Sequence, residues 1–396
     1  MNNIIPYELD FPCEIIYNIV VFTKDRIANG NKMNNENQID DGAEPIRRPP
    51  VRVGIVGLGR AALQKHLPAL EKLADQFAIT AVCDLMKERR DIVERAHPDV
   101  HTYRRVEDML DDPDVEAILV SLPSNDHQKT ALESLSRGKW TIVETPLALS
   151  HDDALVLRAA AIKARGKLIP FSSGLFAPDY RLALMALDDQ RLGELYEIRI
   201  RRQDYIRRDD WLTVKRCGGG VAFYTGQDAI MQAVALLRTQ PSQLWSELKR
   251  VTSLGDAEDF AHIVLKTRGE TTADIEINGG VLPPFEPAIT LRGSRGTFSV
   301  AAGATEGVFH VVDPAFQFPR RRSSVRTPAL NDLHEQFQVV DIPLSLPADA
   351  VAGDTAFWRT LYSTIRVAAP FPVVLDDVVE AIRYLHLVKQ ASPFAK

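Results

Sequence analysis

The stretch Val51-Arg-Val-Gly-Ile-Val-Gly-Leu-Gly-Arg-Ala-Ala62 decides the fold of this chain of 396 residues. Its first six residues are mostly β-branched and follow two prolines, which predicts a buried strand of a parallel sheet. The strand runs into Gly57-x-Gly59-x-x-Ala62, the spacing of a phosphate-binding turn that opens a helix. In such a turn the first small residue makes the bend, the second lets a pyrophosphate approach the backbone, and the third keeps helix and strand close. The segment therefore predicts dinucleotide binding.

The next predicted strand supports this interpretation. Ile79 to Cys83 is apolar and is followed directly by Asp84. An acidic residue at the end of the second strand, about 20 residues beyond the glycines, binds the adenosine ribose hydroxyls in dinucleotide-binding folds. Strand, glycine turn, helix, strand and acid thus agree, whereas a glycine motif alone could be merely structural.

Composition excludes several classes of function. The length predicts two or three domains of about 150 residues each. A hydrophobic content of 45% with 25% charged residues is typical of a globular protein. The net charge of −6 disfavours nucleic acid and acidic membrane surfaces as partners, and we interpret the basic run 320–322 as a solvated loop.

Cysteine usage and the N-terminal region bear on metals and localisation. Cys13, Cys83 and Cys217 are too few and too scattered for a disulfide framework or a CxxC metal site, and we predict no metal. The apolar run 15–22 is far too short to span a membrane and lacks the basic flank of a signal peptide, so we expect a cytoplasmic protein.

The chain divides into three predicted regions. Residues 1–50 include a polar, asparagine-rich stretch and are predicted to form a flexible extension, with translation starting at Met1 or Met33. Residues 51–173 alternate strands with helices, among them a helix predicted from Leu63 to Phe77, and this predicts a doubly wound parallel sheet of the Rossmann type. Residues 174–396 contain a run of consecutive strands and a few helices, among them an apolar helix predicted from Val221 to Leu237, and this predicts an α+β domain with a large, mostly antiparallel open sheet.

Several further motifs follow the glycine turn along the chain. Together they are GIVGLGRAA at 54–62, AVCD at 81–84, the SLPSNDH loop at 121–127, Glu144-Thr-Pro-Leu147, the triple glycine at 218–220, and LRGSRGTFSV at 291–300. With these motifs the chain resembles, from residue 51 onward, the Gfo/Idh/MocA oxidoreductases. This resemblance implies a small-molecule substrate and a cofactor site. The half-exposed sheet predicted for residues 174–396 is a natural association surface, so we also expect a homo-oligomer. The implied cofactor-binding residues are Gly57, Gly59, Arg60, Ala61, Asp84, Leu122, Pro123, Asn125, His127, Glu144, Thr145 and Pro146.

The residues after Asp84 favour NAD over NADP. Leu85 and Met86 follow it, so a 2′-phosphate would face a carboxylate with no arginine fork directly beside it. Lys87, Arg89 and Arg90 lie a little further on and keep NADP as an alternative.

The catalytic pattern departs from the one that the resemblance implies. The family usually carries a lysine at the position of Thr145, and an aspartate, a histidine base and a second aspartate at the positions of Tyr224, Asp228 and Met231. Threonine brings no positive charge, and an exposed aspartate, with a pKa of about 3.9, is a poor base at neutral pH unless burial raises its pKa. Tyr224 could donate a proton if a cation lay near it.

We therefore name Tyr224, Asp228 and Thr145 as candidate catalytic residues. Arg201, Arg202 and Lys215 precede the triple glycine and are candidates for the cation or for binding an acidic substrate. The function predicted is an NAD(P)-dependent oxidoreductase with a non-standard site, reducing a carbonyl or imine or acting on a sugar-like or specialised substrate. The alternative is a noncatalytic dinucleotide-binding protein that acts as a sensor or structural partner.

Overall fold

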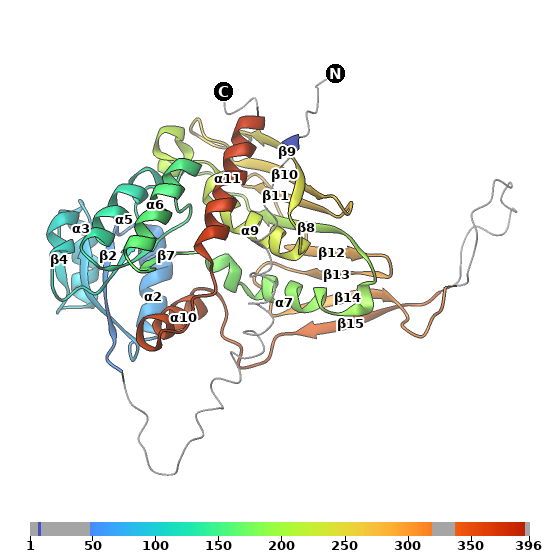
Figure 1. Cartoon of the computed structure of the whole chain (residues 1–396), viewed down its shortest axis with the longest axis horizontal. Coiled ribbons are helices and arrows are strands. Elements are labelled where there is room, and N and C mark those ends of the chain that lie inside the picture. Colours follow the sequence, from blue (N-terminus) through green and yellow to red (C-terminus); the bar gives the residue numbers. More distant parts are fainter. Residues whose placement is uncertain (1–6, 9–47, 319–336, 393–396) are drawn as a thin grey trace, which may run out of the picture.

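The computed structural model describes residues 7–8, 48–318 and 337–392. Two sheets lie side by side, with the first half of the chain around one and the second half around the other (Figure 1). The apolar run 15–22, the basic run 320–322, Cys13 and Met33 fall outside the described residues.

The first sheet is the predicted parallel Rossmann sheet. Its 6 strands lie in the order β4-β3-β2-β5-β6-β7, and every neighbouring pair is parallel. The strands are β2 (Val51–Val56), β3 (Phe77–Cys83), β4 (His101–Tyr103), β5 (Ala117–Val120), β6 (Trp140–Val143) and β7 (Leu168–Pro170). The connecting helices include α3 (Lys87–Ala96), α4 (Val106–Leu110), α5 (His127–Ser136) and α6 (His151–Lys163). The central strands β2 and β5 are almost wholly buried, as continuous apolar runs require.

The helix after the glycine turn differs from the sequence expectation. A single helix is predicted from Leu63 to Phe77, but the chain forms a wide π-helical turn over Ala62–His66 and then the short helix α2 (Leu67–Glu71). Pro68 lies in the first turn of α2, where its missing N–H costs nothing. Turns of this π-helical kind are rare in proteins, and those that occur are often found at functional sites.

The second sheet has 9 strands in the order β1-β9-β10-β11-β8-β12-β13-β14-β15 and confirms the predicted large, mostly antiparallel sheet. Among the described strands of this sheet, β8 and β11 are the one parallel pair. Its strands are β1 (Tyr7–Glu8), β8 (Leu195–Gln203), β9 (Pro241–Lys249), β10 (Phe260–Thr267), β11 (Thr272–Asn278), β12 (Ile289–Gly293), β13 (Gly296–Val300), β14 (Glu306–Val312) and β15 (Val339–Ser345). Sequence reasoning missed β14 and β15, and it assigned the two residues of β1 to the flexible extension.

Helices cover one face of this sheet. They are α7 (Pro178–Leu187), α9 (Gly226–Leu237) and α11 (Leu375–Ala391), which contact strands along its length (Figure 1). Burial alternates along β10 and β11, so the opposite face carries partly exposed, largely polar side chains. The homo-oligomer expected from the sequence stays a prediction. Among the described residues, no helix is long and apolar enough to cross a membrane.

One late helix packs against the first half of the chain. Phe357, Trp358 and Leu361 of α10 (Gly353–Val367) belong to the apolar cluster that contains the buried strand residues Val53 and Ile55. At the end of α10, the Arg366 guanidinium binds the Glu116 carboxylate at 2.6 and 2.7 Å and also donates to the carbonyls of Pro49 and Pro50. The predicted boundary at residues 173/174 stays a prediction, but the packing crosses it.

The apolar helix predicted from Val221 to Leu237 is broken. It consists of α8 (Val221–Tyr224) and α9, separated at Thr225. Gly226 begins α9 at a point where a Cβ would lie 2.9 Å from the Leu385 side chain of α11. This break places Tyr224 at the end of one helix and Asp228 in the first turn of the next.

Candidate functional site

The predicted cofactor residues gather at one edge of the Rossmann sheet. The glycine turn follows β2, Asp84 follows β3, the Leu122 loop follows β5 and Glu144 follows β6. These four strands are parallel neighbours, so their carboxyl ends meet at the same edge, where ligands of such sheets bind. The structure therefore brings together the groups that the sequence assigned to the cofactor.

The two glycines of the turn have different environments. Gly57 has a φ of +87°, and a Cβ there would lie 2.4 Å from the Ser121 carbonyl oxygen, so only glycine fits. A Cβ on Gly59 would meet nothing within 4 Å. Gly57 is thus required by the protein itself, whereas Gly59 leaves open space in which a phosphate could approach the backbone.

Asp84 is fixed beside the glycine turn. Its carboxylate accepts hydrogen bonds from the backbone N–H of Leu58 and of Met86, each at 2.8 Å. Arg89 lies 3.4 Å from the same carboxylate, and Arg90 donates to the Asp84 carbonyl. Asp84 thus has the position of a ribose-binding acid, with two arginines close by.

His127 is buried and connects two loops. Its Nδ1 lies 2.8 Å from the Pro146 carbonyl and its Nε2 lies 2.9 Å from the Leu122 carbonyl. Burial lowers the pKa of the His127 imidazole, although the two carbonyls oppose that effect. Because its ring is enclosed, His127 positions the loops after β5 and β6 and exposes no nitrogen to the cleft.

Glu144 forms a buried pair with a histidine that sequence reasoning missed. His66, fully buried at the end of the π-helical turn, has its Nε2 2.7 Å from the Glu144 carboxylate. The second Glu144 oxygen accepts from the Thr145 backbone N–H at 3.1 Å. Burial alone would raise the pKa of Glu144, but the hydrogen bond from His66 and the charge of Lys65 hold it below its ordinary value. Glu144 is therefore an anion at neutral pH.

The other edge of the His66 ring faces the C-terminal helix α10. The rings of His66 and Trp358 lie 5.8 Å apart in an edge-to-face arrangement. Neither His66 Nδ1 nor Trp358 Nε1 has a hydrogen-bond partner within the described part of the chain. The Glu144 pair is thus enclosed by an element more than 200 residues away in the sequence.

Asp228 is held at the start of α9. Its Oδ2 accepts from the Gly174 N–H at 2.9 Å, and its Oδ1 is buried without a partner among the described residues. Burial, reinforced by the charge of Glu144, raises the pKa of Asp228 to about 6. This answers the objection that an exposed aspartate is too weak a base: the group can exchange a proton near neutral pH.

Tyr224 lies within the electrostatic reach of Glu144. Burial and that charge raise the pKa of the Tyr224 phenol, while Lys65, Arg208 and Arg60 lower it. The phenol is therefore protonated at neutral pH and can donate. The charge of Glu144 thus acts on both Tyr224 and Asp228, and the catalytic role predicted for Tyr224, Asp228 and Thr145 stays a prediction.

The three cations named from the sequence have partners of their own. Arg201 binds the Asp274 carboxylate at 3.1 Å on the large sheet, and Arg202 donates to Gln232 at 2.7 Å and to Asp179 at 3.3 Å. Arg202 also acts electrostatically on Asp228, and Lys215 acts on Glu258 and Lys389. That one of these three supplies the cation beside Tyr224, or binds an acidic substrate, stays a prediction.

Glutamines tie the two halves of the site together. Gln227 of α9 accepts from the Leu147 N–H at 2.9 Å and donates to Ser172 at 3.1 Å, and all of these groups are buried. Gln232 donates to the Gly174 carbonyl at 2.7 Å. These contacts fix α9, and with it Asp228, against the ends of β6 and β7. These contacts are hard to predict, because the sequence shows a glutamine in an apolar helix but does not indicate which group it binds.

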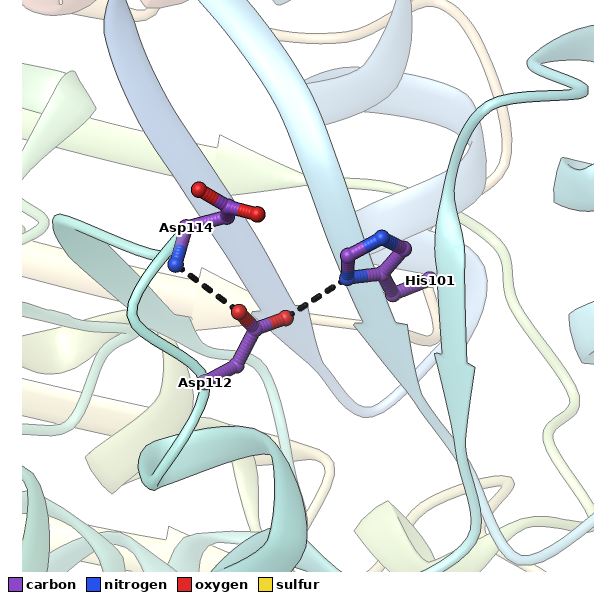
Figure 2. A group of neighbouring side chains, drawn as sticks. All are labelled: His101, Asp112 and Asp114. Carbon is purple, nitrogen blue, oxygen red and sulfur yellow. Dashed lines mark hydrogen bonds and ion pairs between the residues drawn. The ribbon is translucent and has the colours of Figure 1, made fainter.

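The folded chain brings together one group of side chains of the kind that bind metals, away from this site. His101, Asp112 and Asp114 lie near one another between β4 and β5 (Figure 2). The Asp112 carboxylate already accepts from His101 Nδ1 at 2.8 Å, from the Tyr103 hydroxyl at 2.9 Å and from the Asp114 N–H at 2.8 Å. These bonds hold β4 to the loop before β5, and the expectation that no metal binds stays a prediction.

Comparison with known proteins establishes the family. One family model, described as "Oxidoreductase family, NAD-binding Rossmann fold", matches residues 51–171, and a second, the "GFO/IDH/MocA C-terminal domain", matches residues 180–299. The chain belongs to the Gfo/Idh/MocA oxidoreductases. The resemblance seen in the sequence is thereby confirmed, as is the combination of a Rossmann domain with a large, mostly antiparallel sheet.

Relatives in this family are distant. An uncharacterised oxidoreductase of Schizosaccharomyces pombe is 26% identical over 258 residues, which cover 63% of this chain and 70% of that protein. A second one from the same organism is 27% identical, over 55% of this chain and 60% of that protein. The scyllo-inositol 2-dehydrogenase (NADP(+)) of Bacillus subtilis is 22% identical, over 63% of this chain and 68% of that enzyme.

Solved structures of Gfo/Idh/MocA type share the fold. GenD2 from gentamicin A biosynthesis, determined in complex with NAD, has a TM-score of 0.66 at 17% identity, covering 90% of this chain and 97% of its own. An NAD-binding protein from Listeria innocua has a TM-score of 0.69 at 19% identity, covering 86% of this chain and 94% of its own.

Proposed function

We propose that this Gfo/Idh/MocA protein is an NAD(P)-dependent oxidoreductase that reduces the carbonyl or imine group of a small molecule. The observation that carries the proposal is the joint placement of a protonated phenol, Tyr224, and a carboxyl group with a near-neutral pKa, Asp228, beside Glu144 at the end of β6. Two groups that can exchange protons, next to a predicted nicotinamide site, are what carbonyl reduction requires.

The cofactor end of the cleft fits a dinucleotide. The open space at Gly59 would admit the pyrophosphate, and Asp84 would bind the adenosine ribose. Arg60, Ala61, Leu122, Pro123 and Asn125 complete the proposed binding surface, with Glu144, Thr145 and Pro146 at its nicotinamide end. GenD2 was determined in complex with NAD, and the B. subtilis relative is named as an NADP(+) enzyme. We favour NAD because Asp84 would repel a 2′-phosphate.

A bound nicotinamide supplies or accepts a hydride. The residues of this chain manage the proton and the charge. The Tyr224 hydroxyl donates its proton to the oxygen or nitrogen of the substrate as negative charge develops there. Asp228 exchanges protons with the site near pH 6 and restores the phenol. Thr145 offers a hydroxyl for positioning the substrate.

The test is direct turnover by the full chain. Purified protein is incubated with NADH or NADPH and a panel of ketones, aldehydes and cyclic imines, and cofactor oxidation is followed by absorbance. We expect oxidation with at least one class. Tyr224→Phe and Asp228→Asn should each reduce kcat/KM by about 100-fold or more, the typical contribution of a proton-transfer group.

Matched controls are available on the same molecule. Tyr196→Phe alters an exposed tyrosine of β8, and Asp377→Asn alters another buried carboxyl group, in α11. Both should leave turnover unchanged. Cofactor binding by calorimetry with no oxidation by any substrate, and no effect of the Tyr224 and Asp228 variants in cells, would instead support the noncatalytic sensor.

A further inference from the structure

The site contains two acidic side chains and a phenol, and it needs a positive charge. Glu144 is anionic and its charge raises the pKa of the Tyr224 phenol, so a phenolate formed at Tyr224 would meet repulsion from it. Of the arginines that the sequence suggested, Arg201 is bound to Asp274 on the large sheet and Arg202 is bound to Gln232 of α9. Donation by Tyr224 therefore requires a cation from another element.

Lys65 lies where such a cation is needed. It belongs to the π-helical turn Ala62–His66 and directly precedes His66, whose ring is anchored to Glu144 at 2.7 Å. His66 is completely buried, whereas Lys65 is exposed. The hydrogen bond thus fixes the backbone next to Lys65 beside Glu144, at the proposed nicotinamide end of the site, and the Lys65 residue itself is exposed.

The charges that act on Lys65 come from four separate elements. They are Tyr224 at the end of α8, Glu144 after β6, Asp354 in the first turn of α10, and Asp228 in α9. Among the described residues, the Lys65 ammonium forms no ion pair or hydrogen bond of its own. The Lys65 charge therefore acts on all four of these groups and is not neutralised by an ion pair with one of them.

The two other cations that act on Tyr224 are already paired. Arg208 binds the Asp210 carboxylate in a bidentate arrangement, and Arg60 lies 3.4 Å from the same carboxylate. Their charge at Tyr224 is partly cancelled by Asp210. This leaves Lys65 as the available cation within the described part of the site.

We propose that Lys65 is the positioning cation of this site and stabilises the phenolate that Tyr224 forms when it gives up its proton. The inference rests on the proposed function. In the step, hydride adds to the substrate carbonyl carbon, the C=O π electrons move to oxygen, and that oxygen takes the Tyr224 proton; NADH or NADPH is oxidised and the carbonyl is reduced to an alcohol. Lys65 holds the phenolate charge until Asp228 passes a proton from solvent to the phenol.

The charge state of Lys65 supports this role. Partial enclosure by protein would lower the pKa of Lys65, but Tyr224, Glu144, Asp354 and Asp228 raise it above its ordinary value. The lysine is therefore cationic throughout the physiological range. The lysine that the family usually carries at the position of Thr145 is replaced here by one from a different strand-to-helix connection.

The first test needs neither cofactor nor substrate. The phenol of Tyr224 is titrated by ultraviolet absorbance of tyrosinate, as the difference between proteins with and without Tyr224→Phe, in the wild-type and Lys65→Met backgrounds. We expect Lys65→Met to raise the Tyr224 pKa by about one unit, the effect of removing a nearby opposite charge. An unchanged Tyr224 titration would overturn the proposal.

The second test uses turnover and a rescue variant. Lys65→Met should lower kcat/KM about 30-fold or more, and Lys65→Arg should retain most activity because the charge is kept. Lys72→Met, at an exposed lysine just beyond α2, is the matched control and should change nothing. Equal activity of wild type and Lys65→Met would overturn the proposal.

The outcomes separate this inference from the proposed function. If the wild-type protein oxidises no cofactor, the proposed function fails, and the titration alone decides whether Lys65 acts on Tyr224. If the wild type is active but Lys65→Met changes neither the Tyr224 pKa nor kcat/KM, only the inference about Lys65 fails. Because the Lys65 side chain is exposed, the variant should unfold at the wild-type temperature, which calorimetry verifies.

Discussion

The two ends of the cleft are built on different physical principles. At the glycine turn, shape and backbone groups define the site: Gly57 has no room for a side chain, Gly59 faces open space, and Asp84 is fixed by two backbone N–H groups. At the proposed nicotinamide end, the site is defined by groups with perturbed pKa values, on Glu144, Tyr224 and Asp228. We infer that the first kind of site tolerates little change, whereas in the second a charged residue can be replaced by one elsewhere in the fold.

The largest effect is expected at the glycine turn itself. Gly57→Ala places a Cβ 2.4 Å from the Ser121 carbonyl at a positive φ and should destabilise the protein by about 3 kcal/mol or more. Denaturant unfolding measures this loss. Gly59→Ala is the control: its stability should change by less than about 1 kcal/mol while cofactor affinity falls. Equal losses of stability in Gly57→Ala and Gly59→Ala would contradict the idea that Gly57 is needed for folding and Gly59 for cofactor binding.

A second prediction concerns a buried acid outside the site. Burial, with the neighbouring Asp376 and Glu380, raises the pKa of Asp377 to about 7. The folded state then binds more protons than the unfolded state between about pH 4 and pH 7, so this group's contribution to stability falls as pH rises through that window. Asp377→Asn should raise stability at pH 8 by a few kcal/mol and have little effect near pH 4. Thermal unfolding at both pH values tests this.

The contribution of Asp228 to stability should also fall as pH rises, but replacing Asp228 should lower activity as well. With a pKa of about 6, Asp228 costs stability increasingly between about pH 4 and pH 6. We expect Asp228→Asn to stabilise the protein at pH 8 by about 1 to 2 kcal/mol while lowering turnover. Asp377→Asn should stabilise without loss of activity. If Asp228→Asn and Asp377→Asn changed stability and turnover to the same extent, the assignment of Asp228 alone to the site would be contradicted.

The smallest effect is expected in cofactor choice. Asp84→Ser removes the carboxylate that would oppose a 2′-phosphate and leaves Arg89 and Arg90 beside it. The preference for NADPH over NADH should rise about tenfold. Dissociation constants for both cofactors measure the change, with Lys87→Ala as a control for a cation that is paired with Asp91. A loss of affinity for both cofactors to the same extent would argue against the assigned ribose contact.

Sequence reasoning reached the features that are local in the chain. The strand, glycine turn and acid of the first half lie within a few elements, and their periodicity and turn residues are visible directly. The His66–Glu144 bond joins residues 78 positions apart, and neither residue displays its partner in the sequence. The same holds for the orientation of Arg201 and Arg202, which is set by pairing with Asp274 and Gln232.

Two local predictions failed for physical reasons that lie outside the local pattern. The helix after Gly59 widens at Ala62–His66, where the buried His66 reaches Glu144. The helix from Val221 breaks before Gly226, whose close approach to Leu385 of α11 leaves no room for a side chain. Both irregularities lie beside the candidate site, and tertiary contacts rather than helix propensity decide them.

The contact between Trp358 and His66 limits how this protein could have been assembled by recombination. The residues matched by the dinucleotide-binding family model end at 171, yet the histidine that sets the charge of Glu144 is enclosed by α10. A chimera that joined residues 51–171 to another C-terminal domain would keep every cofactor residue and lose that enclosure. The two domains of this chain are therefore a matched set, and we expect α10 and the glycine-turn helix to be inherited together.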